Sequence, residues 1–272
     1  MIQIQNMWFS YQNDKNILKN ISFRIKDGES VGILGKNGAG KTTLIKTFNG
    51  LLKPNKGEVL IDKVSTFSES ISRLSKKVGI AFQNPDHILF SGTVRDEILF
   101  SLKNWNLSTQ DIDEKFEKTV KLFQLEPLLD KSPFILSGGQ RKLVSIASIF
   151  SWEPKHIILD EPTIGQDSNH KKLLTRILKN YVNDGNVLII ITHDVDWAIK
   201  IFSRIIILKD GQILADGSPE RIFYHSNIIE KSELLPPQIV SLNIEIAKIW
   251  NDFPKYIINE DEMKKLMIDY SK

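Results

Sequence analysis

Apolar and polar residues alternate along the first sixty residues in the manner of half-buried strands. IQIQNMWFSY (residues 2–11) and NISFRI (20–25) follow this two-residue period, and QNDKN (12–16) and KDGE (26–29) have turn composition. SVGIL (30–34) is a continuous apolar run, typical of a buried strand. We expect a helix over LIKTFNGLL (44–52), ending near Gly50 or shortly after, and then another strand over GEVLIDK (57–63).

Helical spacing dominates residues 84–155. TVRDEILFSL (93–102), STQDIDEKFEKTVKLFQL (108–125) and SGGQRKLVSIASIFSW (137–152) each have an apolar stripe, and Ser108 and Ser137 are suited to cap two of them. We interpret this stretch as a mostly helical insertion.

Strands and helices alternate after the insertion, which indicates a parallel sheet. The expected order is strand HIILD (156–160), helix SNHKKLLTRILKNYVND (168–184), strand NVLIIIT (186–192), helix VDWAIKIFS (195–203) and a hairpin over 204–217. LLPPQIVSL (234–242) follows, then a break and two helices. The sequence therefore predicts an α/β core over residues 1–83 and 156–220, a helical subdomain over 84–155 and a small extension over 221–272.

Composition narrows the class of protein. The 272 residues include no cysteine, which excludes disulfides and cysteine-based metal sites. The formal net charge of +3 is too small to indicate a nucleic-acid partner, and we expect none. No apolar run approaches the length of a membrane span, and the first residues do not resemble a signal peptide. We expect a cytosolic protein, or one bound peripherally to the cytosolic face of a membrane.

A phosphate-binding loop follows the strand over residues 30–34. Residues 35–42, GKNGAGKT, match the Walker A pattern G-x-x-x-x-G-K-[ST] between a strand and a helix. The helix N-terminus offers free N–H groups and partial positive charge to phosphate oxygens. Lys41 is expected to reach the β- and γ-phosphates, and Thr42 to ligate Mg²⁺. The residues predicted to bind nucleotide in this loop are Gly35, Lys36, Asn37, Gly38, Ala39, Gly40, Lys41, Thr42 and Thr43.

Two acidic residues end the strand HIILD. Asp160 is placed to hold Mg²⁺, directly or through water, and Glu161 to orient or activate the attacking water. Gln83 follows a short apolar strand and is a candidate for contact with the metal or the water. His193 follows the strand over 186–192 and is a candidate for contact with the γ-phosphate. The spacing alone is equally compatible with ordinary loop residues at these last two positions.

Together these motifs resemble the ATP-binding subunits of ATP-binding-cassette transporters over about the first 220 residues. Walker A, Gln83, LSGGQ (136–140), IILDE (157–161), GQD (165–167) and His193 occur in that family's order. The resemblance implies a P-loop NTPase (RecA-like) core with N-terminal antiparallel strands, and a cassette spanning about residues 2–240. It also implies ATP as substrate, Mg²⁺ as cofactor and ATP hydrolysis as the activity.

LSGGQ also looks like a phosphate-binding segment, although the chain already has a better match to one in the Walker A loop. The question is why one chain would carry two. In the family that this chain resembles, two cassettes face each other head to tail, and ATP lies between the Walker A loop of one and the LSGGQ of the other. The resemblance thus implies that Ser137, Gly138, Gly139 and Gln140 act on the nucleotide of a second ATPase subunit. Ser137 is also suited to cap the following helix.

Three further features come from the resemblance. Tyr11 stands where the family stacks an aromatic ring on adenine, whereas Trp8 and Phe9 are better placed to alternate into the core. Asp167 resembles the acid that contacts the partner subunit. Gln166 stands where many members have Leu, and RKLVSIASIF (141–150) differs from the commoner run after the signature.

The stretch FQNPDHILFSGTVRDEILFSL (82–102) narrows the resemblance to energy-coupling-factor transporters and the related cobalt and nickel importers. It implies that the region after Gln83 docks on integral membrane subunits, and that the C-terminal segment packs against the other ATPase subunit. A homodimer and a heterodimer both remain open. The alternative function is a soluble member of the superfamily acting on ribosomes or DNA, although no long coiled-coil or second cassette is present.

Overall fold

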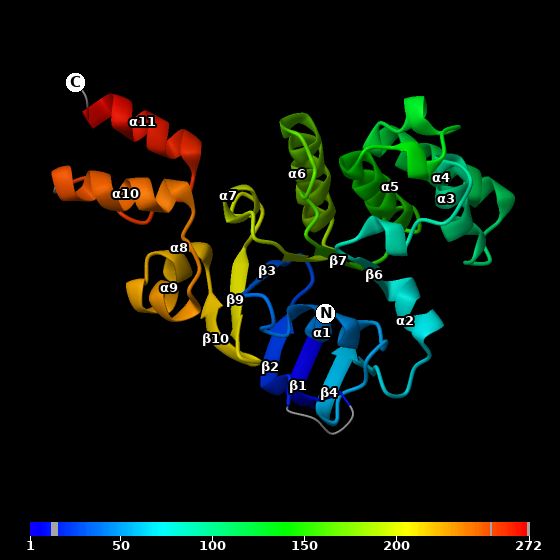
Figure 1. Cartoon of the computed structure of the whole chain (residues 1–272), viewed down its shortest axis with the longest axis horizontal. Coiled ribbons are helices and arrows are strands. Elements are labelled where there is room, and N and C mark those ends of the chain that lie inside the picture. Colours follow the sequence, from blue (N-terminus) through cyan, green and yellow to red (C-terminus); the bar gives the residue numbers. More distant parts are fainter. Residues whose placement is uncertain (12–15, 251, 271–272) are drawn as a thin grey trace.

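Two β-sheets and the helices packed on them make up the computed structural model, which describes residues 1–11, 16–250 and 252–270 (Figure 1). Most of the turn expected over residues 12–16 lies outside the described residues. The larger sheet has the strand order β10-β9-β3-β8-β7-β6. Its six strands are β3 (Ser30–Leu34), β6 (Val78–Ala81), β7 (His156–Asp160), β8 (Val187–Ile191), β9 (Arg204–Lys209) and β10 (Gln212–Gly217).

Neighbouring strands of the larger sheet pair in parallel, except that β10 pairs antiparallel with β9 and forms the expected hairpin. The carboxyl ends of the parallel strands therefore meet along one edge. Ligands of open α/β sheets bind at this edge, because the loops that leave these strand ends carry free side chains and helix N-termini.

The smaller sheet is antiparallel and has the order β2-β1-β4-β5. Its strands are β1 (Ile2–Phe9), β2 (Leu18–Ile25), β4 (Lys56–Ile61) and β5 (Val64–Ser65). Buried and exposed residues alternate along β2, as the two-residue period of the sequence predicts for a sheet with one face in the core.

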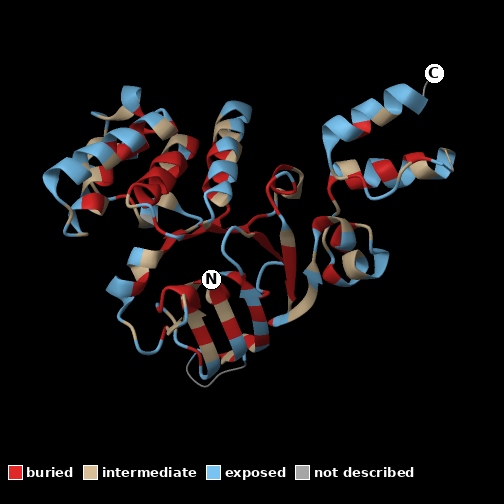
Figure 2. Ribbon diagram, turned by 180° about the vertical axis from the view of Figure 1, so that it is seen from behind, coloured by how far each residue is buried: buried red, intermediate tan, exposed pale blue. Residues whose placement is uncertain are grey.

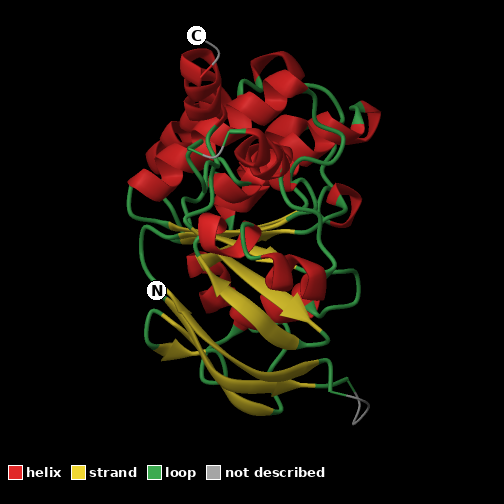
Figure 3. Cartoon of the chain, turned by 90° about the vertical axis from the view of Figure 1, so that its left-hand side faces the viewer, coloured by secondary structure: helices red, strands yellow, loops and turns green. Residues whose placement is uncertain are grey.

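Helix α1 (Lys41–Phe48) joins the two sheets into one core. Its buried Leu44, Ile45 and Phe48 belong to the same apolar cluster as Val59 of the smaller sheet and Ile189 of the larger one. Figure 3 shows the resulting layers, with the smaller sheet at the bottom and most helices above the larger sheet. The start of α1 is thereby fixed between two rigid elements.

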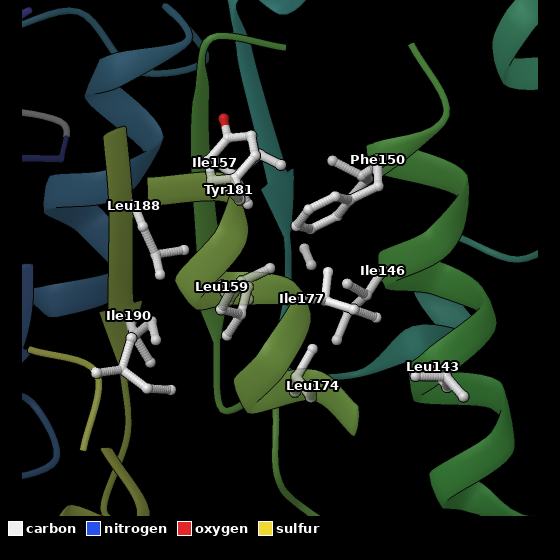
Figure 4. Close-up of a cluster of buried hydrophobic side chains, with 14 of the residues drawn as sticks. Leu143, Ile146, Phe150, Ile157, Leu159, Leu174, Ile177, Tyr181, Leu188 and Ile190 are labelled. Atoms are coloured by element: carbon white, nitrogen blue, oxygen red, sulfur yellow. The ribbon is translucent and has the colours of Figure 1, made fainter. Parts of the chain in front are cut away.

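Helices α5 (Gly138–Phe150) and α6 (Ser168–Asn183) cover the opposite face of the larger sheet. Figure 4 shows Ile146 and Phe150 of α5 and Ile177 of α6 packed around Leu159. Neighbouring residues of β7 point to opposite faces, since Leu159 lies in this cluster and Ile158 in the cluster around α1. Both strands are buried throughout, and burial on both faces explains why the middle of β7 and all of β8 are apolar. Figure 2 shows the buried strands in red at the centre of the molecule.

The region between β6 and β7 is helical, as expected. It contains α3 (Val94–Lys103), α4 (Thr109–Phe123) and α5, with single 3₁₀ turns η1 (Pro85–His87), η2 (Glu126–Leu128) and η3 (Pro133–Ile135). Ser108 and Ser137 both form capping boxes, with Asp111 and Gln140 as their reciprocal partners. The apolar faces of α3, α4 and α5 are buried against one another.

The described residues after β10 form helices α8 (Pro219–Phe223), α9 (Ser226–Ser232), α10 (Gln238–Ile249) and α11 (Glu260–Tyr270). The last two surround a small apolar cluster of their own, which includes Ile246, Phe253 and Met263. They stand beyond β10, away from the sheets, in Figure 1. Within the described residues, no helix is both long and apolar enough to cross a membrane.

Three local expectations differ from the structure. Helix α7 spans only Val195–Ala198, although the pattern predicts a helix to residue 203. The chain turns after Ala198 because Ser203 N donates to Ser30 O (3.0 Å) and Ser30 Oγ donates to Ile201 O (2.5 Å). Helix α2 (Ile71–Lys77) is not predicted from the pattern, and α10 begins inside LLPPQIVSL rather than after a break.

Candidate nucleotide-binding site

The Walker A loop runs from the end of β3 to the start of α1. A Cβ atom at Gly35 would lie 2.2 Å from Leu208 O, so only glycine fits where the loop passes β9. Gly40 precedes α1 with φ +100°, a left-handed conformation that favours glycine. The loop therefore presents backbone N–H groups at a helix N-terminus, the arrangement that binds phosphate.

The Lys41 ammonium lies across this loop. Its Nζ donates to Gly35 O (2.6 Å) and Lys36 O (2.9 Å). Burial lowers the pKa of Lys41, although the nearby carboxylates of Glu161 and Asp160 act in the opposite direction. The side chain is thus held as a buried donor inside the loop, in contrast to Lys36, whose side chain forms a salt bridge with Glu233 between α9 and α10.

Thr42 and Asp160 supply neighbouring oxygens where α1 faces the end of β7. Thr42 Oγ1 donates to Asp160 Oδ2 (3.4 Å). Burial and the charge of Glu161 raise the pKa of Asp160, although Lys142, Thr42 and Lys41 act in the opposite direction. Among the described residues, no group of three or more His, Cys, Asp or Glu side chains forms a metal site. One carboxylate beside one hydroxyl fits Mg²⁺, which takes its other ligands from phosphates and water.

Glu161 lies at the bend that leaves β7, with φ +50°. Its N–H donates to Ile191 O (2.8 Å), and its Oε2 accepts from Thr192 Oγ1 (3.1 Å) and His193 N (3.3 Å). Its Oε1 is buried, accepts no hydrogen bond from the residues described, and lies 3.5 Å from His193 Nε2. One carboxylate oxygen is therefore fixed, and the other is left to accept from a molecule bound in the site.

Asp160, Glu161, Gln83 and His193 meet because β7, β6 and β8 are adjacent strands. A cavity of about 1270 Å³ lies in front of them. The predicted site residues that line it are Asn37, Gly38, Gly40, Lys41, Thr42, Thr43, Gln83, Asp160, Glu161 and His193. The fold thus brings predicted site residues from four segments of the sequence together around one cavity.

Other predicted residues do not line this cavity. The Ala39 side chain is buried in the core beside α1. Tyr11 is 42% exposed and packs edge-to-face on Phe9, with ring centroids 4.9 Å apart. Neighbouring residues that the sequence reasoning missed do line it, namely Asn16, Ile17, Lys19, Thr163, Ile164, Asp194 and Asp210. Thr163, Ile164 and Asp194 closely follow predicted site residues in the sequence, whereas no motif marks Asn16, Ile17, Lys19 or Asp210.

The LSGGQ segment lies outside the cavity of its own chain. Ser137 Oγ accepts from Gln140 N (3.2 Å), and Gln140 Oε1 accepts from Ser137 N (3.1 Å), so both side chains cap α5. Ser137 and Gly138 are exposed, whereas Gly139 is buried. The helix N-terminus therefore faces solvent at Ser137 and Gly138.

Gly139 is buried because the segment GQD lies on it. A Cβ atom at Gly139 would be 2.3 Å from Gly165 O, and Gln166 Nε2 donates to Gly139 O (2.9 Å). Gln166 thus fastens the start of α5 to the loop that follows Glu161. Asp167 is exposed and caps α6 by accepting from His170 N (2.9 Å).

The matching family model carries the description ABC transporter and covers residues 18–164, more than half of the chain. The chain belongs to the ABC transporter family. The ABC family members that it resembles include the energy-coupling factor transporter ATP-binding protein EcfA of Methanocaldococcus jannaschii, 35% identical over 100% of this chain and 98% of that protein. EcfA1 of Mycoplasmopsis synoviae is 38% identical over 96% and 97% of the two chains.

Solved ABC structures agree with this fold. CbiO1 of Clostridium perfringens, described as part of the ABC transporter complex cbiONQ, is 35% identical and superposes with a TM-score of 0.75 over 89% of this chain and 97% of that chain. A dimeric ATP-binding cassette bound to ADP and Pi is 29% identical, with a TM-score of 0.72 over 80% and 98%. The predicted α/β P-loop fold is confirmed, and this ABC protein is a nucleotide-binding ATPase.

Proposed function

We propose that this ABC ATPase energises an energy-coupling-factor type importer of vitamins or transition-metal ions. The observation that carries the proposal is one cavity lined by the Walker A loop, Gln83, Glu161 and His193, with Ser137 and Gly138 of LSGGQ exposed elsewhere on the same chain. The full-length similarity to EcfA and EcfA1 supports the subfamily.

The residues of the cavity divide the chemistry among them. Lys41 and the N–H groups of the Walker A loop hold the β- and γ-phosphates, while Thr42, Asp160 and Gln83 hold Mg²⁺, which neutralises phosphate charge when bound. Glu161 Oε1 accepts a hydrogen bond from the attacking water and orients it in line with the γ-phosphate. His193, beside Glu161, contacts the γ-phosphate. Tyr11, which does not line the cavity, is assigned to stacking on adenine by the family resemblance alone.

The exposed N-terminus of α5 indicates a second subunit. Ser137 and Gly138 are exposed at a helix N-terminus, the kind of position that binds phosphate. Neither residue lines the nucleotide cavity of its own chain. We infer that Ser137, Gly138, Gly139 and Gln140 complete the site of a second ATPase subunit, with Asp167 at the contact. The dimeric relative bound to ADP and Pi supports this pairing. A homodimer and a heterodimer both satisfy this geometry.

The surface after Gln83 is suited to a membrane subunit. Phe90 and Phe100 are exposed and pack edge-to-face on each other, with centroids 4.6 Å apart. The buried Glu97 carboxylate fixes this surface, because its Oε2 accepts from Phe90 N (3.1 Å) and Ser91 N (2.9 Å). We infer that cytoplasmic helices of the integral subunits dock here, which places the protein peripherally on the cytoplasmic face of the membrane.

The C-terminal extension exposes apolar side chains, among them Leu235, shortly before α10, and Ile249, its last residue. We infer that this extension packs against the other ATPase subunit. Lys36 and Glu233 join it to the Walker A loop of the same chain.

The proposal is tested with a tagged Glu161→Gln variant extracted from native membranes with ATP and a mild detergent. The variant binds ATP without hydrolysing it, so we expect a closed ATPase pair that co-purifies with integral membrane proteins, while steady-state turnover falls at least about 100-fold. Phe90→Ser in the same background is the matched control, which should keep ATP binding and lose the integral proteins. Co-purification of ribosomes or DNA in place of membrane proteins would support the soluble alternative.

A further inference from the structure

The ammonium group of Lys142 is buried where three segments of the chain meet. Lys142 stands in the second turn of α5, and its side chain is 2% exposed. Its Nζ donates to Phe82 O (2.8 Å), Gln83 O (3.1 Å) and Asp160 O (2.7 Å). It forms no salt bridge with a described residue, and all three of its hydrogen-bond acceptors are backbone carbonyls. An ammonium has three N–H donors, and three carbonyl oxygens accept them.

The three carbonyls belong to the peptide groups that orient the reacting side chains. Phe82 O lies in the peptide before Gln83, and Gln83 O lies in the peptide after it. Asp160 O lies in the peptide that joins Asp160 to Glu161. Rotation of any of these peptides would turn Gln83, Asp160 or Glu161 away from the cavity that all three line.

Glu161 needs such support, because it is a non-glycine residue with φ +50°. A left-handed conformation of this kind costs about 1–3 kcal/mol and persists only where surrounding contacts enforce it. The Lys142 bond to Asp160 O holds the preceding peptide, and the bond from Glu161 N to Ile191 O (2.8 Å) holds the residue itself. The first bond comes from α5, which covers one face of the larger sheet, and the second involves Ile191, at the end of the neighbouring strand β8.

We propose that Lys142 is a positioning residue for ATP hydrolysis, which sets the orientation of Gln83, Asp160 and Glu161 from the helix that begins at the signature serine. The assignment rests on the roles given to those three residues in the proposed function. The same helix presents Ser137 to the second subunit. Lys142 therefore fixes the position of Ser137, which acts on the nucleotide of the second subunit, relative to the nucleotide site of its own chain.

The main test compares Lys142→Met with Lys142→Gln in the full chain. Methionine leaves three buried carbonyls without a donor, and glutamine supplies two N–H donors for three acceptors. We expect kcat to fall about 10- to 100-fold in Lys142→Met and about 3- to 10-fold in Lys142→Gln, since misplacement by about 1 Å can cost 100-fold. The KM for ATP should stay within about twofold of wild type, because the Walker A loop is untouched. If Lys142→Met does not fold, Lys142→Gln alone carries the test.

Ile146→Ala is the matched control for loss of stability. Ile146 is buried on the same helix, one turn after Lys142, and lies beside Ile177 in Figure 4 rather than at the cavity. We expect it to lower thermal stability while leaving kcat within about twofold. Amide hydrogen exchange should separate the two effects: Lys142→Gln should speed exchange at Gln83 and Glu161, and Ile146→Ala should not.

Wild-type kcat in Lys142→Gln would overturn the inference, and so would an equal fall of kcat in Ile146→Ala. Glu161→Gln serves as the separate check on the proposed site. If Glu161→Gln retains full turnover, the site assignment fails whatever Lys142 does. If Glu161→Gln is inactive while both Lys142 variants hydrolyse ATP at the wild-type rate, only the role of Lys142 is rejected.

Discussion

Gly138 and Gly139 are neighbours at the start of α5, yet a methyl group added to each meets different surroundings. At Gly139 it would lie 2.3 Å from Gly165 O, and at Gly138 nothing lies within 4 Å. We therefore predict that Gly139→Ala destabilises the isolated protein by about 1–3 kcal/mol, because the backbone after Glu161 must move. Gly138→Ala should leave stability equal or raise it by up to about 1 kcal/mol, since alanine favours helix over glycine. Urea unfolding measures both effects.

Turnover should respond differently from stability in these two variants. If Gly138 faces the nucleotide of a second subunit, its alanine variant loses most ATPase activity while remaining fully folded. A Gly138→Ala protein with normal turnover would mean that no phosphate approaches this glycine. Equal stability of Gly139→Ala and wild type would show that the contact with Gly165 is loose.

At the scale of single residues, the sequence predicts those site residues whose role depends on neighbours along the chain. The Walker A loop and Asp160 are recognisable because a strand, a turn and a helix follow one another without interruption. Lys142 and Thr192 were not predicted, since their partners Gln83 and Glu161 are distant in sequence. From the sequence, Gln166 differs only in standing where many family members have Leu. Its hydrogen bond to Gly139 O depends on the folded chain, which brings α5 next to the loop after β7.

At the scale of elements, the junction between the two sheets contains a buried histidine. His156 begins β7, is 0% exposed, and its Nε2 lies 3.1 Å from Asp62 Oδ1 in the turn between β4 and β5. Burial lowers the pKa of His156 from 6.5 to about 4, although Asp62 acts in the opposite direction. Burial opposes ionisation of Asp62, but the amino terminus and His156 outweigh it and hold the pKa of Asp62 at about 2.

The sign of the pH dependence follows from these pKa values. Between pH 6.5 and about 4 the unfolded chain binds a proton at His156 that the folded chain excludes, so the free energy of unfolding falls as the pH falls. The loss amounts to roughly 3 kcal/mol when complete. The contribution of Asp62 is present above its ordinary pKa of 3.8 and is lost only as the pH falls from there to about 2, below the range of His156.

We predict that His156→Gln flattens this dependence between pH 6.5 and 4, because glutamine keeps a side-chain donor for Asp62 and does not titrate. Urea unfolding at several pH values measures the slope. His225→Gln is the control, since His225 is exposed and lies outside this junction. An unchanged slope in His156→Gln would assign the acid sensitivity to other groups.

Strands and helices are predicted well where burial of one or both of their faces determines the pattern of apolar residues. The strands β3, β7 and β8 are short apolar runs because both faces of the larger sheet are covered, and α4 has a polar face and a capping box. Helix α7 is shorter than its pattern because hydrogen bonds to Ser30 hold residues 201–203 against the start of β3, which the local sequence does not show. The C-terminal helices were less predictable, since much of their apolar surface is exposed in the single chain.

At the scale of the whole molecule, the described chain builds one nucleotide cavity and directs the signature serine away from it. If each site is shared between two subunits, a variant damaged only at Lys41 and a variant damaged only at Ser137 should complement each other. A mixed pair has one intact site, formed by Lys41 of the second variant and Ser137 of the first. Mixing Lys41→Ala with Ser137→Ala should restore about a quarter of wild-type turnover, since about half of randomly formed pairs are mixed.

Two controls separate a shared site from trivial effects. Ser137 also caps α5, so its alanine variant loses about 1 kcal/mol of helix stabilisation. Ser108→Ala removes the equivalent cap of α4, where Ser108 Oγ accepts from Asp111 N (3.1 Å), and should retain full turnover. The Lys41→Ala/Ser137→Ala double variant should rescue neither single variant, because each pair then lacks one half of every site.

The mixing experiment applies directly if the chain pairs with itself. If its partner is a different ATPase subunit, one change is introduced into each of the two subunits. Every pair then keeps one intact site of two, so about half of wild-type turnover is expected. Turnover that is high in Ser137→Ala alone, or that does not increase on mixing, would show that one chain hydrolyses ATP by itself. The exposed N-terminus of α5 would then be only a capped helix end, and the solvent-facing position of Ser137 would have no catalytic meaning.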